Sequence, residues 1–89
     1  MDTAVVDNPA AHRFEIRVDG QVAGFVRYRL APGKIVFIHT EIDPVYEGKG
    51  LGSTLAAGAL DAARQRSLEI DPQCPFIAAY LKRHPEPAQ

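Results

Sequence analysis

The sequence Tyr46-Glu47-Gly48-Lys49-Gly50-Leu51-Gly52-Ser53 separates an apolar, strand-like run from a run with helical spacing. Its three glycines stand at alternate positions, and glycine lets several backbone N–H groups face one point with no Cβ in the way. A helix that starts there adds unpaired N–H groups and the positive end of its dipole, equivalent to roughly half a charge. The stretch therefore predicts a β-to-α junction that holds a phosphate or a diphosphate.

Two other glycine motifs and one purely structural role compete with this interpretation. A P-loop needs four residues between its glycines and then Gly-Lys-Ser/Thr, which this loop does not provide. The dinucleotide motif Gly-x-Gly-x-x-Gly also fails, because Ser53 stands where its third glycine belongs. The remaining alternative is a flexible loop whose small residues let a helix pack closely on a sheet.

Hydrophobic periodicity places this junction inside a small α+β domain. Alternating residues predict strands over 12–18, 21–30 and 34–42, with an Asp19-Gly20 hairpin turn between the first two. Leucine and alanine at helical spacing predict a helix over 51–66, followed by a short strand over 67–71 and a final helix over 75–83. The first three strands should form an antiparallel meander, and the crossover helix should make the fourth strand parallel to the third.

Finer expectations concern the strand faces and the ends of the domain. In the second strand Val22, Val26, Tyr28 and Leu30 are in phase, and Gly24 is expected to mark a β-bulge. The run 35–38 has no polar residue, so we expect it to be central and covered on both faces. Residues 1–11 are expected to form a flexible lead-in, and the domain is expected over 12–86.

Composition limits the classes of function. The 89 residues are 46% hydrophobic, which suits one small folded domain, and no apolar run approaches the roughly 20 residues of a membrane helix. A net charge of −1 argues against broad nucleic-acid binding. A single cysteine and an acidic start with no basic n-region predict a protein of the reducing cytoplasm, with neither a membrane nor a nucleic acid as partner.

The order of elements around the glycines resembles the acetyl-CoA site of the GNAT superfamily of N-acetyltransferases. The pyrophosphate loop of that superfamily reads Arg/Gln-x-x-Gly-x-Gly/Ala and usually follows Pro-x-Tyr. Here Pro44 and Tyr46 are in place, and Glu47, Gly50 and Gly52 occupy the three loop positions. The resemblance implies a diphosphate held by the loop, with Glu47 as a departure from the pattern.

A closer resemblance is to the short, single-domain GNAT-like family, and it runs from about Phe14 to Glu86. The matching motifs are His39-Thr40-Glu41, Cys74-Pro75-Phe76, Tyr80 and His84-Pro85-Glu86. This likeness implies a minimal acyl-CoA N-acyltransferase fold, acetyl-CoA as co-substrate, no metal, and an unidentified amine acceptor that is a small molecule or a protein. The short length leaves the acceptor side open or completed by another molecule, so a homodimer is one expectation.

Cofactor contacts follow from the loop and from the end of the third strand. The residues expected to hold the diphosphate and the first helical turn are Gly48, Lys49, Gly50, Leu51, Gly52 and Ser53. The resemblance implies that pantetheine hydrogen-bonds near Glu41 and Ile42 like an added strand, where backbone N–H groups also polarise the thioester carbonyl. The Glu47 carboxylate would repel a diphosphate, so we expect it to turn to solvent or to cap the helix.

His39 is the candidate general base. It interrupts an apolar strand close to the loop, and an ordinary histidine pKa of about 6.5 suits proton transfer at neutral pH. The alternative is a buried histidine hydrogen-bonded to the backbone. Glu41 shares its strand face by parity and either orients the base or is solvated.

Cys74 and Tyr80 are the other two catalytic candidates. Cys74 is placed at a helix N-cap by Pro75, where the dipole favours a thiolate. It is acylated, donates a proton or contacts CoA; alternatively it is a small buried hydrophobe. In many GNAT enzymes a tyrosine on this helix protonates the leaving thiolate, and for Tyr80 the alternative is core packing.

Three functions remain open from the sequence. The first is an acetyl-CoA-dependent N-acetyltransferase, by direct attack of the amine or with the cysteine assisting. The second is a non-catalytic CoA-binding or protein-interaction module, and the third is a structural α+β domain with no ligand.

Overall fold

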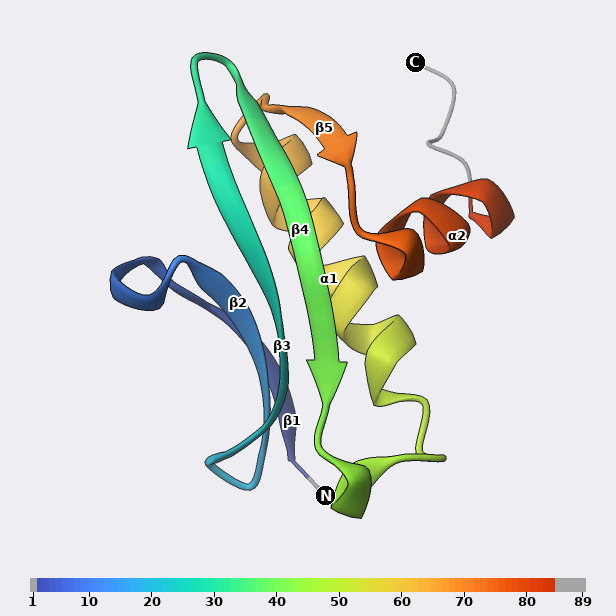
Figure 1. Ribbon diagram of the computed structural model, residues 1–89. Helices are drawn as coiled ribbons and strands as arrows, with labels where there is room; N and C mark the ends of the chain where they lie inside the picture. Colours follow the sequence, from blue (N-terminus) through green and yellow to red (C-terminus); the bar gives the residue numbers. More distant parts are fainter. Residues whose placement is uncertain (1, 85–89) are drawn as a thin grey trace.

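The computed structural model describes residues 2–84 and consists of a five-stranded sheet with two helices (Figure 1). The strands are β1 (Thr3–Asn8), β2 (Arg13–Val18), β3 (Gln21–Ala31), β4 (Lys34–Ile42) and β5 (Glu69–Pro72). The two α-helices are α1 (Leu51–Gln65) and α2 (Pro75–Arg83). Two short 3₁₀ helices are also present, η1 (Pro9–Ala11) and η2 (Pro44–Tyr46). The sheet order is β1-β2-β3-β4-β5. The first four strands pair antiparallel and β5 pairs parallel with β4, which confirms the predicted α+β arrangement.

The prediction that residues 1–11 form a flexible lead-in is wrong for the residues of this segment that the structure describes. Thr3 to Asn8 form β1, which pairs along its whole length with β2. Asn8 then caps η1, its side chain accepting a hydrogen bond from the Ala11 amide. The fold therefore begins nine residues earlier than the predicted boundary at 12, and the last two residues of the predicted range 12–86 lie outside the described part.

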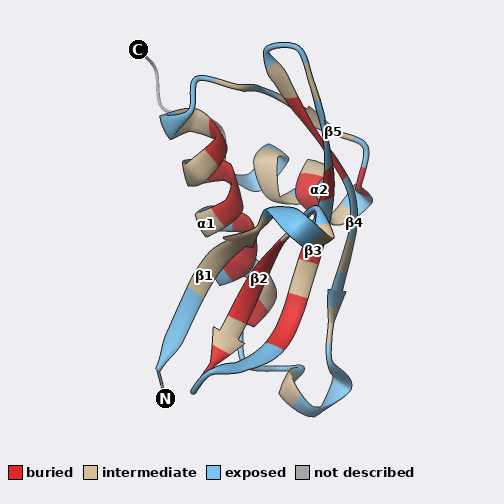
Figure 2. Ribbon diagram, turned by 90° about the vertical axis from the view of Figure 1, so that its left-hand side faces the viewer, coloured by how far each residue is buried: buried red, intermediate tan, exposed pale blue. Residues whose placement is uncertain are grey.

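The core lies between α1, α2 and one face of the sheet, where Figure 2 shows the buried residues. From β2 the alternate residues Phe14, Ile16 and Val18 point into this core. Its other main members are Val26, Tyr28, Ile35, Phe37, Leu55, Ala59, Leu60 and Ile77. Small residues keep α1 close to the sheet, since a Cβ at Gly58 would lie 2.8 Å from the Val5 side chain on β1.

The other side of the sheet carries the alternate residues Arg13, Glu15, Arg17, Phe25 and Arg27, and we call it the open face. Both helices pack into one core on the opposite side, and no helix of the described residues covers this face. Glu15 is nevertheless buried, because the side chains of Arg13, Arg17 and Asn8 surround it and donate hydrogen bonds to it. One side of the sheet is thus a helix-covered core and the other a charged surface.

Two bulges change which residues are buried. Ala23 is an extra residue on β3, next to Gly24, so the bulge expected there is present and shifts the phase. As a result Ala23 is buried and Val22, expected in phase with Val26, is exposed. Leu30 keeps the phase of Val26 and Tyr28 and pairs with Ile35, but it is 55% exposed near the end of β3. Gly24 itself lets β4 approach, since a Cβ there would lie 2.6 Å from the Glu41 carbonyl oxygen.

The second bulge makes Ile38 an extra residue on β4, between the pairs Tyr28 with Phe37 and Arg27 with His39. Ile35, Val36 and Phe37 are buried as predicted, but Ile38 is 42% exposed. The prediction that the whole run 35–38 is covered was wrong at this last residue. After the bulge Thr40 and Ile42 lie on the helix side, and His39 and Glu41 lie on the open face.

The strand β5 accompanies only the first half of β4. It pairs with Lys34 to Phe37, after which Cys74 N donates to Phe37 O at 2.8 Å and the chain enters α2. Residues 38–42 of β4 therefore have β3 on one side and no strand on the other within residues 2–84. We call this stretch the free edge of β4; it leads directly into η2 and the glycine loop. In the described chain neither helix has the length and hydropathy needed to cross a membrane.

Candidate active site

The junction between β4 and α1 is shaped by local hydrogen bonds and by glycine. Asp43 caps η2 by accepting a hydrogen bond from the Val45 amide at 3.0 Å. Gly48 and Gly50 then adopt positive φ angles of 81° and 73°, which disfavour other residues. Gly50 is the N-cap of α1 and supplies no side chain to its first amides.

Most of the amides at this junction have no internal partner. Glu47 N donates to Pro44 O at 3.2 Å, and the next backbone hydrogen bond along the chain joins Thr54 N to Gly50 O at 3.3 Å. Between them, no amide from Gly48 to Ser53 donates to an acceptor within the described residues. Backbone N–H groups without a partner in the protein normally donate their hydrogen bonds to water or to a ligand.

A hollow of about 290 Å³ lies beside these amides, and we call it the loop hollow. It is lined by Thr40, Ile42, Tyr46, Glu47, Gly48, Gly50, Leu51, Gly52 and Phe76. Phe76, from the first turn of α2, closes it against the first turn of α1, and a Cβ at Gly52 would lie 2.9 Å from its ring. The loop, the free edge of β4 and the start of α2 thus meet at one site.

The glycine loop carries one charged residue of each sign, of which only Glu47 lines the hollow. Glu47 is exposed and lines the hollow, and it does not cap α1. Lys49 is also exposed, with its Nζ 6.0 Å from the centre of the Tyr46 ring. Of the two alternatives for Glu47, solvent exposure is therefore what the structure has. Ser53 is exposed on the first turn of α1.

Cys74 is buried at the N-cap of α2, the position that Pro75 predicts. Its Sγ lies 3.2 Å from Thr40 Oγ1, across the gap between α2 and the free edge of β4. The thiol packs in the core cluster on its other side. The Thr40 hydroxyl therefore joins the cysteine to the wall of the loop hollow.

His39 and Glu41 lie side by side on the open face. The His39 Nε2 is 3.8 Å from Glu41 Oε2, and the two side chains are 59% and 60% exposed. The His39 ring meets the Phe25 ring edge-on, with 6.4 Å between the centroids. His39 is thus an exposed histidine beside a carboxylate, and the alternative of a buried, backbone-bonded histidine is not the one observed. It faces away from Thr40 and Cys74, with only the width of β4 between them.

Tyr80 lies near the other end of α2. It is half-buried against the core and stacks on His84, with 4.4 Å between the ring centroids. It lies outside the lining of the loop hollow. The structure therefore brings together Cys74, Ile42 and the glycine loop, and places Tyr80 further along the helix.

Two residues of the site were missed from the sequence. Thr40 was read only as part of a motif, because the bulge at Ile38 that turns it toward Cys74 has no sequence signal. Phe76 was likewise read as a motif residue, although its place as the second residue of a helix that starts at Pro75 could have indicated a wall of the site. Among residues 2–84 no group of three or more metal-ligating side chains comes together.

Comparison with known proteins gives a consistent result. The family model described as GCN5-related N-acetyl-transferase matches residues 13–89. "Protein NATD1" from Mus musculus is 31% identical over 77 residues, covering 84% of this chain and 70% of the relative. A "Putative [ribosomal protein bS18]-alanine N-acetyltransferase" from Bacillus subtilis is 32% identical over 71 residues, covering 74% of this chain and 47% of the relative.

A solved structure supports the fold. The ribosomal-protein-alanine N-acetyltransferase from Brucella melitensis biovar Abortus 2308 superposes with a TM-score of 0.63 at 22% identity. The match covers 86% of this chain and 62% of that one, so the chain spans less than two thirds of the length of this structural relative.

Proposed function

Since the chain belongs to the GCN5-related N-acetyltransferase family, we propose that it binds acetyl-CoA at the β4–α1 junction and transfers the acetyl group to a primary amine. The observation that carries the proposal is the row of amides from Gly48 to Ser53, which have no internal acceptor and lie beside the loop hollow. These amides and the N-terminus of a fifteen-residue helix suit a diphosphate. The glycines Gly48, Gly50 and Gly52 let the ligand approach them.

The free edge of β4 is the proposed binding line for the pantetheine arm. Asp43 N donates to Ala23 O at 2.8 Å, so this amide points toward β3. Successive amides of a strand point to opposite edges, which directs those of Ile42 and Thr40 outward and that of Glu41 toward β3. The proposed contacts are therefore Ile42 and Thr40, and Glu41 contributes through its side chain on the open face.

Bound acetyl-CoA supplies the acetyl group as an activated thioester. His39 accepts one proton from the incoming ammonium, with its Nε2 3.8 Å from Glu41 Oε2. The amine nitrogen bonds the acetyl carbon as the carbon–sulfur bond breaks. Of the three ammonium protons one stays on the amide and two pass to water, the first of them through His39. The CoA sulfur takes its proton from a side-chain donor, which takes one back from water. The outward amides of Thr40 and Ile42 are placed to polarise the carbonyl.

Cys74 and Tyr80 are proposed as the donors to the leaving sulfur. Cys74 is the nearer to the loop hollow, through its 3.2 Å contact with Thr40 Oγ1. Tyr80 stacks on His84 and lies outside the hollow, so this role would require it to move. The structure therefore favours Cys74, which donates its proton and regains one from water.

A non-catalytic CoA-binding module is the second candidate, and Glu47 favours it. An exposed carboxylate in the lining of the loop hollow weakens binding of a diphosphate, and none of the ion pairs within residues 2–84 involves Glu47. Under this proposal acetyl-CoA binds and is not consumed.

The experiment combines calorimetry of acetyl-CoA with mass spectrometry of a mixture of primary amines. We expect binding, acetylated amine and free CoA from the unmodified protein. His39→Asn should lower kcat about a hundredfold with the affinity for acetyl-CoA unchanged, as expected for loss of a general base. His12→Asn is the matched control, because His12 is exposed in the left-handed region that asparagine tolerates. Binding with no acetylated product would establish the module instead.

A further inference from the structure

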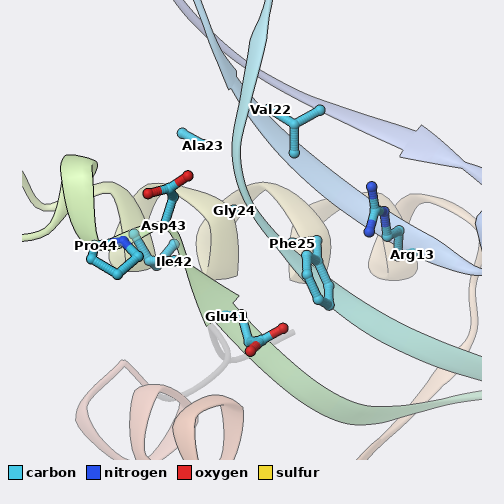
Figure 3. Close-up of a pocket in the computed structure, with 9 residues that line it drawn as sticks. All are labelled: Arg13, Val22, Ala23, Gly24, Phe25, Glu41, Ile42, Asp43 and Pro44. Atoms are coloured by element: carbon cyan, nitrogen blue, oxygen red, sulfur yellow. The ribbon is translucent and has the colours of Figure 1, made fainter.

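A second hollow of about 310 Å³ lies on the open face, on the other side of β4 from the loop hollow, and we call it the face hollow (Figure 3). Its walls include Val22 and Phe25 from β3, Glu41 from β4, Asp43 just beyond β4, and Pro44 from η2. Arg13 from β2 closes its far end. Ile42 lines both hollows, and the binding of acetyl-CoA proposed above places no part of the ligand in this one.

The face hollow is polarised along its length. Figure 3 shows Arg13 at one end and Asp43 with Pro44 at the other, with Phe25 and Glu41 between them. The Arg13 guanidinium stands 4.6 Å over the Phe25 ring and donates to Glu15 at 2.8 Å, so its charge is shared with a buried carboxylate. Arg27 lies opposite Arg13 and His39 and adds positive charge at the same end. The carboxylates Glu41 and Asp43 form the negative end.

Both carboxylates are open to a ligand. In the described part of the chain no lysine or arginine forms an ion pair with either of them, and the neighbour of Glu41 is His39 at 3.8 Å. Asp43 uses Oδ1 for the Val45 amide, which leaves Oδ2. Asp43 stands two positions after Glu41, just beyond β4, and its φ of −58° and ψ of 130° keep the chain extended, so roughly 7 Å separates the two Cα atoms. Between them the hollow has the apolar surface of Val22, Phe25 and Pro44.

We propose that the face hollow binds the acceptor of the reaction and that this acceptor is an aliphatic diamine. The reacting ammonium lies at Glu41, where His39 takes its proton, and the second ammonium lies at Asp43. The alkyl stem lies along the apolar wall, and the Phe25 ring also attracts a cation. The free edge of β4 is one strand thick, so an amine on the open face reaches a thioester held along that edge. This inference rests on the acetyl transfer proposed above.

Three amines with four carbon atoms each test the proposal. Putrescine ends in a second ammonium, butylamine in a methyl group and gamma-aminobutyrate in a carboxylate. We expect kcat/KM to be about fivefold higher for putrescine than for butylamine, the value of one exposed ion pair, and lowest for gamma-aminobutyrate. Equal rates for the three amines would overturn the diamine site and leave acetyl transfer standing.

Asp43→Asn locates the second ammonium. Asparagine also caps η2, so the fold is kept, and the preference for putrescine over butylamine should fall to within about twofold. Asp61→Asn is the matched control, because Asp61 is exposed on α1 ten residues beyond its start, roughly 15 Å along the axis, and should keep the full preference. A preference that survives Asp43→Asn would overturn the assignment.

Acetyl-CoA affinity is measured in the same samples to separate the two proposals. Binding of acetyl-CoA with no acetylation of putrescine overturns the inference drawn from the face hollow. Absence of acetyl-CoA binding overturns the proposed function itself, and the inference falls with it.

Discussion

At the scale of single residues, the glycines of the junction differ in what they do. Gly48 and Gly50 have positive φ angles and open space around the position of a Cβ, so their role is conformational. Gly52 has no such φ and instead makes room for the Phe76 ring. A substitution at Gly50 therefore tests the loop conformation, and one at Gly52 tests packing.

Gly50→Ala should weaken acetyl-CoA binding about tenfold or more. Alanine at a φ of 73° costs roughly 1–2 kcal/mol, and the loop relieves this strain by turning its amides away from the diphosphate. Calorimetric titration with acetyl-CoA measures the effect.

Gly33→Ala is the control for Gly50→Ala. Gly33, in the turn between β3 and β4, has a φ of 71° and equally open space, so it should lose similar stability in urea unfolding and keep its affinity for acetyl-CoA. Equal loss of affinity in the two variants would mean that the loop amides do not hold the ligand.

Glu47→Gln should strengthen acetyl-CoA binding about threefold. The change removes an exposed negative charge from the lining of the loop hollow, and exposed charge interactions are worth about 0.2–1 kcal/mol. The gain should shrink at high salt, where such interactions are screened. The control is Glu69→Gln on β5, which removes a negative charge outside the loop hollow and should leave the affinity for acetyl-CoA unchanged. If Glu47→Gln also leaves this affinity unchanged, the diphosphate does not bind at the loop hollow.

At the scale of elements, a side-chain cluster fastens β1 to the rest of the fold. Asp7 on β1 accepts hydrogen bonds from Tyr28 on β3 at 2.7 Å and from Arg66, just beyond α1, at 2.8 Å. Burial and the Asp7 carboxylate raise the pKa of Tyr28 to about 12. Asp7 also raises the pKa of Arg66.

Asp7→Ala should lower the free energy of unfolding by about 2 kcal/mol, because it leaves the buried Tyr28 hydroxyl without an acceptor. Urea unfolding measures the loss, and ultraviolet titration should show the pKa of Tyr28 falling back toward 10. Asp61→Ala, at an exposed position of α1, should change stability by less than about 0.5 kcal/mol. A loss as small in Asp7→Ala would show that β1 is held by its backbone pairing alone.

How far the sequence predicted each element depended on whether its signal is local. The Asp19-Gly20 turn, the Pro75 start of α2 and the leucine spacing of α1 are local, and these elements appear as predicted. The strand β1 has no alternation of its own and is fixed by pairing with β2 and by Asp7, both of which join distant residues. The bulge beside Gly24 was predicted from that glycine, whereas the bulge at Ile38 is set by the neighbouring strand and has no local signal, so Thr40 could not be placed from the sequence.

At the scale of the whole molecule, the single layer of helices explains the position of both hollows. α1 and α2 cover one side of the sheet and meet the loop hollow, while the other side is left to the face hollow and to the charged residues of β2 and β3. β5 ends early, so the free edge of β4 lies between the two hollows. The function proposed here needs both sides of that edge.

The charged open face also makes the stability of the whole fold depend on pH. Glu15 is buried among Arg17, Asn8 and Arg13, and their hydrogen bonds, that of Arg17 most strongly, lower its pKa from 4.5 to about 2 against the opposing effect of burial. A carboxyl group with a lowered pKa in the folded state stabilises the fold above its unfolded pKa, and this stability is lost as the pH falls toward the folded value.

The free energy of unfolding should therefore stay level from pH 7 to about pH 5 and fall by about 2 kcal/mol between about pH 5 and pH 2 through Glu15 alone. This figure is smaller than the free energy that corresponds to the whole pKa difference, because the Arg13 and Arg17 side chains are 27% and 41% exposed to solvent.

Glu15→Gln should lower the free energy of unfolding by a similar amount at pH 7, and this variant should then lose correspondingly less stability in acid. Glu69→Gln, at an exposed site, should follow the unmodified protein at every pH. Urea unfolding at each pH measures the difference between the two variants, and parallel curves for them would show that Glu15 does not carry the acid sensitivity of the fold.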